Sequence, residues 1–511
     1  MRRILMPILL LAVAFAALFG SNYLSDQLHE DLGEVSADGT VPPGLGTPLV
    51  STRRLTPMLA PSLTEPGFFS TLDDIMASAP TSACVHVTLD GRGPSFYESG
   101  GNIQVMPSDA FLLLTLATAH QELGPDHTFT TSVLSIVPME DGVVNGDIYL
   151  VGGGDPLLLT TEYLTTLEDG VNRLHTPIEE LAQDLVDDGM ALVTGAVVGD
   201  ATRYDDLLYV GSWPERIIQA ENIGTLLALQ FDDGWVQFPV SESELETDDT
   251  AAGGAEEEVG YQAAEDPPFY AAALFDDMLE ARDVVIRRSP RSEAVPEGEE
   301  LNILASIESA PLKDHYQQIL DNRDVETVEL LLKEIGRVTS GTGSTRAGAS
   351  AVETVLAEIG VDVEEFQLLQ FDGSGLDPAN VASCPVFTSL LNSDEFSPLF
   401  HELLPSAAEP GPLQSRFASV NNPARIRALS GGTATTSLLM GYIDIGRGQE
   451  LTFAFIANQA STTDQASTTD QQSTADNQAL RELEERIVRQ LASLESKPSL
   501  DDLVLEPLRL G

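Results

Sequence analysis

Lysine is almost absent from this chain of 511 residues. Only Lys313, Lys333 and Lys497 occur, among 26 basic residues that face 80 acidic ones, and the formal net charge at pH 7 is −54. No run of basic residues interrupts this acidic character. Because proteins bind nucleic acids by neutralising phosphates with lysine and arginine, the composition argues against a nucleic-acid partner. It indicates instead a solvated acidic surface.

Long hydrophobic runs are also scarce, since the only one spans residues 4–20. Arg2 and Arg3 precede it, and Asp26 and Glu30 follow it. A short basic region before an apolar core is typical of a secretory signal peptide, and the length is at the lower limit for a membrane span. Basic residues before the run and acidic residues after it predict that the rest of the chain lies outside the cytoplasm. We expect a secreted protein, or one anchored by this segment alone, with no other membrane contact.

Cysteine occurs only twice, as Cys84 and Cys384. In an oxidising compartment the two residues could form one disulfide, and the alternative is a pair of buried free thiols. Export favours the disulfide. Such a bond would require residue 84 and residue 384 to belong to the same domain.

Patterns that bind metals or cofactors are missing as well. The seven histidines are scattered singly and never form an H-E-x-x-H frame, so a zinc site is not indicated. The glycine-rich run 152–156 lacks the Lys-Ser/Thr of a phosphate-binding loop, and Ser374 lacks the G-x-S-x-G frame of a hydrolase nucleophile. We therefore expect neither a metal nor a cofactor, and the residues themselves reveal no active site.

Hydrophobic patterning predicts a mixed α/β fold between polar ends. The expected strands are 83–89, 128–137, 146–151, 191–198, 366–370, 426–429, 438–445 and 451–458. The expected helices are 111–123, 178–188, 269–280, 314–332, 353–359 and a final amphipathic helix over 479–496. Segments 21–68 and 459–478 are predicted linkers, the second built on a repeated Gln-Ala-Ser-Thr-Thr-Asp hexapeptide, and 241–268 is a predicted acidic loop.

Several short segments occur in an order that resembles one protein family. They are residues 123–126, 129–131, 146–156, 195–200, 371–376 with Asn380, 404–405 with Gly411, Leu413 and Arg416, and finally Leu439, 441–442 and Asn458. The sequence resembles the class C low-molecular-mass penicillin-binding proteins, which are D-alanyl-D-alanine carboxypeptidases and endopeptidases. The resemblance implies a penicillin-binding-protein/β-lactamase-like transpeptidase fold, whose body spans 69–135 and 300–458 with the final helix. It also implies an inserted domain over 136–299, and a body that contains both cysteines.

The family carries its chemistry in three motifs, Ser-x-x-Lys, Ser-Asp-Asn and Lys-Thr-Gly. Counting from the matching segments places these motifs on Asp109-Ala110-Phe111-Leu112, on Arg323-Asp324-Val325 and on Leu429-Ser430-Gly431. The position of the nucleophilic serine is therefore an aspartate, and both lysine positions are leucines. A shift of one residue makes Ser108 the nucleophile, but Phe111 then takes the place of the lysine.

Loss of these groups predicts loss of the family's reaction. A serine hydroxyl is a poor nucleophile without a neighbouring base, and neither leucine nor phenylalanine accepts its proton. Removing members of such a unit costs roughly 10⁴–10⁶-fold in rate. Asp109 could act as a carboxylate nucleophile or base, but nothing in the sequence marks a partner for it, and a capping or surface aspartate is the simpler interpretation.

Two functions follow as hypotheses. The first is a catalytically inactive member of the family that acts by binding or regulation, with a peptidoglycan stem peptide or an active cell-wall enzyme as its partner. The second is a serine-type D-Ala-D-Ala carboxypeptidase with an atypical site around Ser108 or Asp109. Arg323 could bind a peptide carboxylate through both guanidinium nitrogens, or it could be a surface residue paired with a nearby acid.

Overall fold

The computed structural model describes residues 67–91, 95–167, 173–220, 223–238, 261–414, 416–417, 420, 422–433, 435–459 and 470–494. The apolar segment 4–20, nearly all of the linker 21–68, most of the predicted acidic loop and most of the hexapeptide repeat lie outside these residues. In the described part of the chain, no helix is both long enough and apolar enough to cross a membrane.

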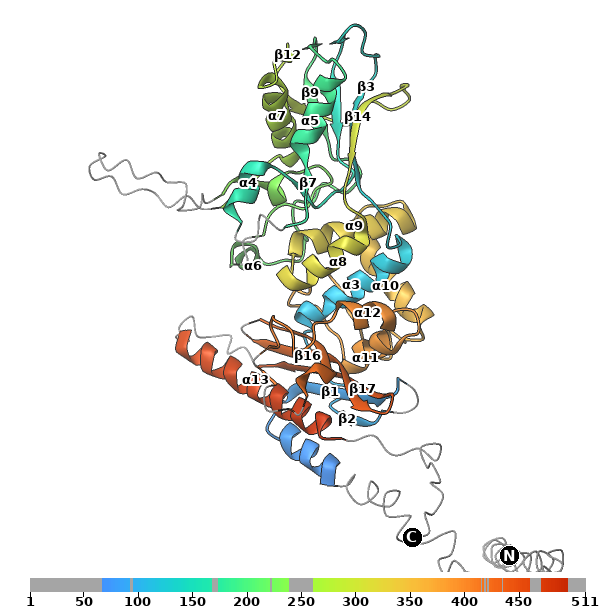
Figure 1. Ribbon diagram of the computed structural model, residues 1–511, viewed down its shortest axis with the longest axis vertical. Helices are drawn as coiled ribbons and strands as arrows, with labels where there is room; N and C mark the ends of the chain where they lie inside the picture. The colour runs from blue at the N-terminus through green and yellow to red at the C-terminus, as the bar shows by residue number, and fades with distance from the viewer. Residues whose placement is uncertain are drawn as a thin grey trace, which may run out of the picture. The chain divides into compact units, whose positions relative to one another are not determined.

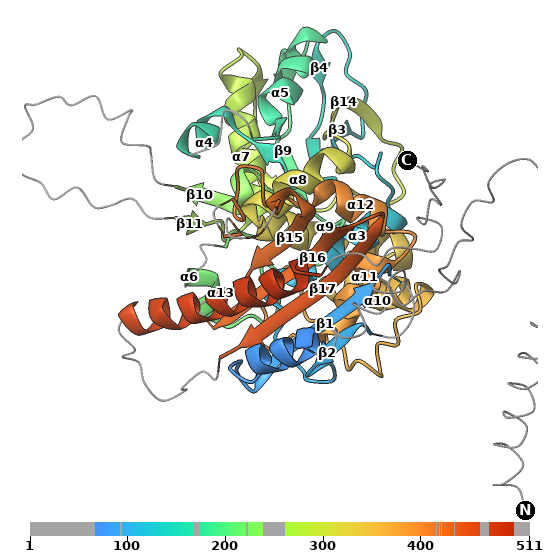
Figure 2. The same ribbon diagram turned by 60° about the horizontal axis from the view of Figure 1, so that its bottom comes forward.

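One five-stranded antiparallel sheet joins the beginning and the end of the described chain. Its strands lie in the order β15 (Ile426–Gly431), β16 (Thr436–Gly446), β17 (Gln449–Asn458), β1 (Ser82–Leu89) and β2 (Tyr97–Ser99), as Figure 2 shows. The predicted strands 83–89, 426–429, 438–445 and 451–458 are thereby confirmed. Successive residues of β16 alternate between two hydrophobic cores, with Leu438 and Met440 in one and Leu439 and Ile443 in the other. Both faces of the sheet are therefore covered.

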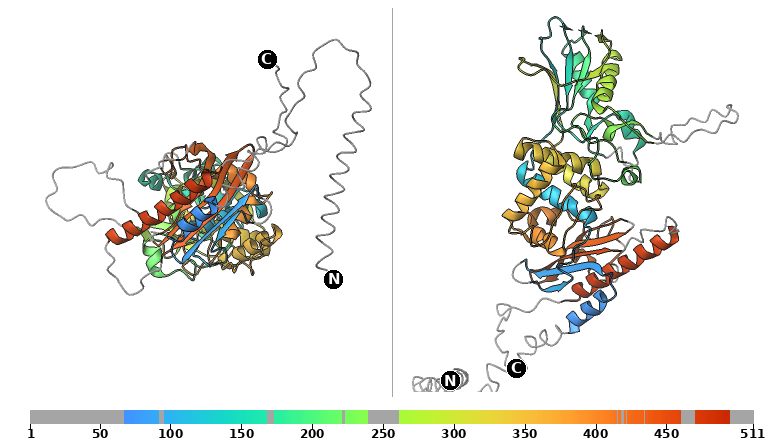
Figure 3. Two further views of the ribbon diagram at one scale, coloured as in Figure 1. Left: turned by 90° about the horizontal axis from the view of Figure 1, so that it is seen from below. Right: turned by 180° about the vertical axis from the view of Figure 1, so that it is seen from behind.

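Helices provide this cover on each face. α13 (Asp470–Ala492) and a helix at 67–76 pack against one face through side chains that include Leu480, Leu483 and Ile487, and Figure 3 shows α13 lying across the sheet. α3 (Phe111–Glu122) and α11 (Cys384–Asn392) pack in the core on the other face. Cys84 of β1 is bonded there to Cys384 of α11, so the predicted disulfide is confirmed.

α3 is the central helix of this second core. Its residues from Phe111 to Ala119 are all buried, which is typical of a helix enclosed on every side. Around it are α8 (Leu312–Asn322), α9 (Val325–Ser340), α10 (Thr345–Glu358) and α12 (Ser397–Leu403). A short 3-10 turn, η1 (Ser108–Ala110), leads directly into α3. A second one, η3 (Pro423–Arg425), precedes β15.

A second five-stranded sheet is formed by the middle of the chain (Figure 1). Its order is β13 (Arg291–Ser292), β9 (Val197–Asp200), β5 (Ile148–Val151), β3 (Thr130–Ser135) and β14 (Asn302–Glu308), with β13 and β5 parallel to β9 and the other pairs antiparallel. α5 (Ile178–Asp187) and α7 (Pro267–Glu280) share its core. Because β3 and β14 belong to this sheet, it extends a few residues beyond each predicted border of the insert.

Short elements complete this part of the chain, from β3 to β14, which we call the middle region. They are β4 (Val143–Val144), β6 (Leu158–Leu159), α4 (Thr161–Thr166), β7 (Thr176–Pro177), β8 (Leu192–Val193), α6 (Glu215–Ala220), η2 (Asp232–Gly234), β10 (Trp235–Gln237), β11 (Gln262–Ala263) and β12 (Val285–Ile286). The predicted mixed α/β class is confirmed by this arrangement.

Five predicted elements differ from the structure. The strand expected over 191–198 is two strands of different sheets, β8 and β9, and the helix expected over 353–359 is the end of α10, which begins at Thr345. The single helix expected over 314–332 is two helices, α8 and α9, interrupted at Arg323. The strand expected over 366–370 is a turn, because Gln367 has a φ of 51° and only Leu369 forms a bridge to another segment. The final helix begins at Asp470, before its predicted start at residue 479. The glutamine and alanine residues between these two positions also favour helix.

Candidate functional site

The three motif positions meet at one place although they are far apart in the sequence. Asp109 lies in η1, Arg323 lies between α8 and α9, and Ser430 is near the end of β15. Arg323 Nε is 3.0 Å from Asp109 Oδ2, and Arg323 Nη2 donates a hydrogen bond of 2.9 Å to the main-chain oxygen of Ser430. The main-chain nitrogen of Gly432 donates to the same Asp109 oxygen at 3.1 Å. The counted positions therefore form one cluster.

Close backbone packing places Asp109 in this cluster. Ser108, directly before it, has a φ of 48°, and its hydroxyl donates to Asp109 Oδ1 at 3.1 Å. A Cβ on Gly375 would lie 1.9 Å from the main-chain oxygen of Ser108, and a Cβ on Gly431 would lie 2.4 Å from Asp109 Oδ2. The approach of Gly375 to the main chain requires glycine, and the absence of a side chain at Gly431 leaves room for the Asp109 carboxylate. Ser108 and Asp109 are consequently buried, with 0% and 8% of their surfaces exposed.

The break between α8 and α9 presents Arg323. Its φ of 52° is left-handed and ends α8, and Asp324 then caps α9 by accepting a hydrogen bond from the main-chain nitrogen of Thr327. Asp324 also pairs with Arg173 at 3.3 Å, and Arg173 pairs with the buried Asp233. Asp324, which the sequence count assigned to the second motif, thus has a structural role that fixes the position of Arg323.

The positions that carry lysine in the motifs hold apolar side chains within the protein core. Leu112, in α3, is 2% exposed, and Leu429, in β15, is 4% exposed. Both belong to the core around α3. Val325, at the start of α9, packs against an adjoining hydrophobic cluster. None of these three side chains can accept a proton or carry a charge.

The lysines that the structure describes are engaged elsewhere. Lys333 of α9 is buried and donates to Asp205 at 2.7 Å and to the main-chain oxygens of Leu207 and Leu226. Burial lowers the pKa of Lys333, but its ammonium group is held by a loop of the middle region. Lys313 pairs with the exposed Asp126, and Lys497 lies outside the described residues.

A cleft of about 290 Å³ adjoins the Asp109–Arg323 pair. We call it the arginine cleft, and it is lined by Arg323, Pro412, Arg416, Ser430, Gly431, Gly432, Thr433, Thr436, Ser437, Arg481 and Glu484. Arg416 pairs with Glu484, which also accepts a hydrogen bond from Ser437. Three guanidinium groups thus line one cleft of a strongly acidic protein, together with hydroxyl groups and a glycine-rich backbone that can donate hydrogen bonds.

Behind η1, two buried carboxyl groups support the turn that contains Ser374. Glu329 accepts hydrogen bonds from the main-chain nitrogens of Gly373 and Ser374, and burial together with the charge of Asp372 raises the pKa of Glu329 to about 8. Asp372 accepts from Trp213, Asn380 and two main-chain nitrogens. This turn places Gly375 against Ser108, so its role in the site is to support the backbone of η1.

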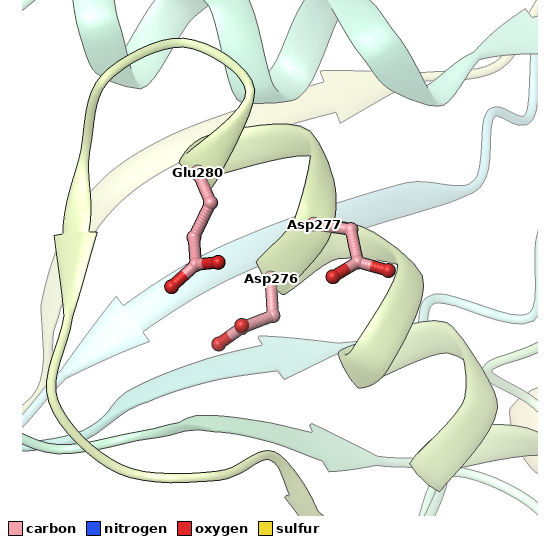
Figure 4. Close-up of side chains that lie close together, drawn as sticks. All are labelled: Asp276, Asp277 and Glu280. Atoms are coloured by element: carbon pink, nitrogen blue, oxygen red, sulfur yellow. The ribbon is translucent and has the colours of Figure 1, made fainter.

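Sequence reasoning missed two charged groups of the middle region. One is the buried Arg173–Asp233 pair that supports Asp324. The other consists of Asp276, Asp277 and Glu280 on α7 (Figure 4), which in the described residues is the one group of side chains close enough together to hold a metal ion. Glu280 follows Asp277 by three residues and Asp276 by four, the spacings that make side chains neighbours on a helix. Burial and the charges of the other two raise the pKa of Asp276 to about 6.

Comparisons with known proteins agree on one family. The sequence model of the D-Ala-D-Ala carboxypeptidase 3 (S13) family matches residues 70–259 and 250–479. The chain is 27% identical over 446 residues to a D-alanyl-D-alanine carboxypeptidase of an Actinomadura species, covering 76% of this chain and 79% of that protein. It is 25% identical over 471 residues to carboxypeptidase DacB of Mycolicibacterium smegmatis, covering 88% and 90%.

The fold agrees with the same comparison. The crystal structure of penicillin binding protein 4 (dacB) from Haemophilus influenzae matches with a TM-score of 0.65 and 18% sequence identity, over 82% of this chain and 99% of that one. The arrangement of sheets and helices described above is therefore that of the penicillin-binding proteins, as the resemblance implied.

Proposed function

The chain belongs to the D-Ala-D-Ala carboxypeptidase 3 (S13) family, and from this premise we propose that it is a catalytically inactive member acting outside the cytoplasm in peptidoglycan metabolism. It would act by binding a peptidoglycan stem peptide through the carboxylate at the end of that peptide. The observation that carries the proposal is the Asp109–Arg323 ion pair, which joins the first and second motif positions where the family places its reacting groups.

Loss of proton transfer supports inactivity. The family's serine needs a lysine beside it, and the residue at that place, Leu112, is an apolar side chain buried in the core. The third motif likewise has Leu429 where the family has a lysine. No proton acceptor is available at either place. A carboxylate at position 109 that is already paired with Arg323 has its charge occupied in a structural contact.

An atypical active site is the alternative, and one contact favours it. The hydroxyl of Ser108 donates to Asp109 Oδ1 at 3.1 Å, so a carboxylate lies beside a serine. A general base within hydrogen-bond reach of its nucleophile is a requirement of serine catalysis. Ser108 is fully buried, however, with 0% of its surface exposed. A substrate carbonyl could not reach that hydroxyl without movement of η1.

The arginine cleft supports binding as the function. Arg323, Arg416 and Arg481 line it, and only Glu484 among its lining residues is acidic. A guanidinium group recognises a carboxylate through two parallel hydrogen bonds. A peptide that ends in a carboxylate is therefore the ligand we propose, and an acidic segment of an active cell-wall enzyme is the partner to be considered if peptides fail to bind.

Catalysis is tested by incubating the purified protein with a fluorescent penicillin and, separately, with a pentapeptide that ends in D-Ala-D-Ala. We expect neither a covalent adduct nor released D-alanine. Either product, if it disappeared in the variants Ser108→Ala or Asp109→Ala, would contradict inactivity and support the atypical enzyme.

Binding is tested by calorimetric titration with the same pentapeptide. Arg323→Gln should weaken binding, because the amide side chain has no charge to offer a carboxylate. The matched control is Arg337→Gln, which should bind as the wild type does. Arg337 is an exposed arginine on α9 that donates to the main-chain oxygen of Gly341. Equal binding by the two variants would show that the peptide does not use Arg323.

A further inference from the structure

A second cavity lies in the middle region and shares no lining residue with the arginine cleft. We call it the insert cavity. Its volume is about 520 Å³, and it is lined by Thr160, Glu162, Glu179, Asp232, Val236, Gln237, Phe238, Tyr270, Leu274, Asp277, Met278, Ala281 and Arg282. These residues come from the first turns of α4 and α5, from η2 and β10, and from α7 and the residues after it. Its volume is in the range of sites that hold small organic molecules.

Negative charge dominates the lining of the insert cavity. Four carboxylates face a single basic residue, Arg282. The guanidinium of Arg282 donates to Gln183 Oε1 at 3.2 Å and to the main-chain oxygens of Met278 and Glu179 at 2.8 and 3.4 Å. These acceptors are all neutral. The hydrogen bonds of Arg282 therefore do not neutralise any of the four carboxylates.

One acceptor in the cavity has no donor. Glu179 Oε1 accepts a hydrogen bond of 2.7 Å from the main-chain nitrogen of Thr161, but Glu179 Oε2 is buried and accepts none from the described residues. Buried polar atoms in proteins are nearly always hydrogen-bonded. A rotation of the half-buried Glu179 side chain would turn this oxygen toward the cavity, where a ligand that carries N–H donors would satisfy it.

A second carboxylate lies close to Glu179. Asp232 is 1% exposed and accepts from the main-chain nitrogen and the hydroxyl of Thr160, one hydrogen bond to each oxygen. Burial, reinforced by the charges of Asp233 and Glu179, raises the pKa of Asp232 to about 7. Two carboxylates that act on each other in this way favour a cation between or beside them.

The other walls are apolar, which decides what kind of cation fits. Phe238, Tyr270, Leu274 and Met278 line the cavity with the carboxylates, and aromatic rings attract organic cations. In the described residues, the carboxylates close enough to share a metal ion are those of Figure 4, and of these only Asp277 lines the cavity. The lining suits an organic cation better than a metal ion.

We propose that the insert cavity binds an alkylammonium group, that is, a primary amine carried on a short aliphatic chain. The ammonium group has three N–H donors for the carboxylates, and Glu179 Oε2 is the acceptor that lacks one. The aliphatic chain would be buried against Leu274, Met278 and Phe238, removing apolar surface from water. This site is independent of the motif positions and of whether the protein is an enzyme.

Calorimetric titration with 1,5-diaminopentane tests the proposal, in phosphate buffer because amine buffers would compete. Pentan-1-ol, which has a similar chain without the charge, is the control ligand. Glu179→Gln removes one charge without changing the shape of the side chain, and Glu180→Gln makes the same change at the next residue, which is exposed and outside the cavity. Asp277→Asn provides a second, exposed position in the lining.

We expect the diamine to bind and the alcohol not to bind. Glu179→Gln should weaken diamine binding about tenfold or more, because a charge-assisted hydrogen bond is lost. Asp277→Asn should weaken it by a smaller factor, and Glu180→Gln should leave it unchanged. Absence of diamine binding, equal binding of the alcohol, or equal affinities of the Glu179→Gln and Glu180→Gln variants would each overturn the proposal. A melting curve of each variant identifies any that fails to fold, in which case the Asp277→Asn result decides.

Discussion

Asp109→Ala should open a second place for carboxylates from solution, beside the arginine cleft that the wild type already offers. In the wild type the Asp109 carboxylate accepts from Ser108 Oγ and Gly432 N, both at 3.1 Å, and is 3.0 Å from Arg323 Nε. Alanine removes this acceptor and leaves the guanidinium and the Gly432 nitrogen facing an empty space. A small carboxylate that entered would restore the same contacts.

The magnitude of the loss follows from these three contacts. The Arg323 side chain is 43% exposed, so its ion pair contributes at most about 1 kcal/mol. The hydrogen bonds from Gly432 and Ser108 contribute about 0.5–1.5 kcal/mol each, although the Ser108 hydroxyl can rotate to another acceptor. We expect Asp109→Ala to lower the free energy of unfolding by about 2 kcal/mol, which corresponds to a drop of roughly 2–5 °C in Tm.

Thermal melting with increasing sodium acetate measures both effects, with sodium chloride at equal ionic strength as the salt control. Acetate should raise the Tm of Asp109→Ala more than that of the wild type, in which Asp109 already occupies Arg323 Nε and Gly432 N. Asp126→Ala is the matched variant, because Asp126 forms an exposed ion pair with Lys313, and it should show neither the loss nor the recovery. If Asp109→Ala melted like the wild type, or if acetate stabilised all three proteins equally, Asp109 would not be the internal carboxylate that we describe.

Three further predictions concern stability. Lys333→Met should lower the free energy of unfolding by about 3 kcal/mol, because a carboxylate and two main-chain oxygens lose their donor. Urea titration measures this loss. The control variant Lys313→Met should have no effect. Burial, with the charges of Asp233 and Asp324, raises the pKa of Glu326 to about 8, so the folded protein keeps a proton that the unfolded chain loses near its ordinary value. The stability that this group contributes is therefore full below about pH 4.5 and decreases as the pH rises to about 8. Glu326→Gln should reduce the slope of the free energy of unfolding against pH by up to about 1.4 kcal/mol per pH unit. Urea titrations at pH 5, 6.5 and 8 measure that slope. Replacing Cys84 and Cys384 together by alanine should cost about 2–5 kcal/mol, measured as a lower urea midpoint, since the bond closes a loop across 300 residues.

The elements that the sequence predicted well are those with strong and regular patterning. The strands that became β1, β15, β16 and β17, and the apolar helix α3, were all found near their predicted positions. β1, β16, β17 and α3 bury most of their residues and β15 buries half, so the run of apolar side chains is long enough to decide the type of each element. The strand expected over 366–370 failed because five residues with a weak alternation do not distinguish an extended strand from a turn.

The break at Arg323 is the feature of the site that patterning could not reveal. Helical periodicity continues across it, and a charged residue in the middle of a long helix is ordinary. One local signal was available, because aspartate is among the preferred residues at a helix start, and Asp324 does accept a hydrogen bond from the main-chain nitrogen of Thr327. That signal divides the predicted helix in two and brings Arg323 to the turn between them.

Contacts across the sequence were beyond prediction for a different reason. Counting placed Asp109 and Arg323 at two motif positions, but whether Arg323 pairs with an acid or stays open for a ligand depends on tertiary packing. A Cβ at Gly431 would lie 2.4 Å from Asp109 Oδ2, so the glycine leaves the carboxylate room to lie where the guanidinium meets it. The insert cavity depends in the same way on four separate segments, which no local pattern connects.

Catalytic inactivity is the central claim, and intact-mass measurement after incubation with benzylpenicillin tests it most directly. An active family member would form a covalent acyl-enzyme through its serine, whereas counting along this sequence puts Asp109 at that position and Leu112 in place of the base. We predict that the mass of the protein, 54.7 kDa for the full chain, stays unchanged after prolonged incubation. An increase by the mass of one penicillin, absent from the Ser108→Ala or Asp109→Ala variant, would contradict the claim and establish an active site in this cluster.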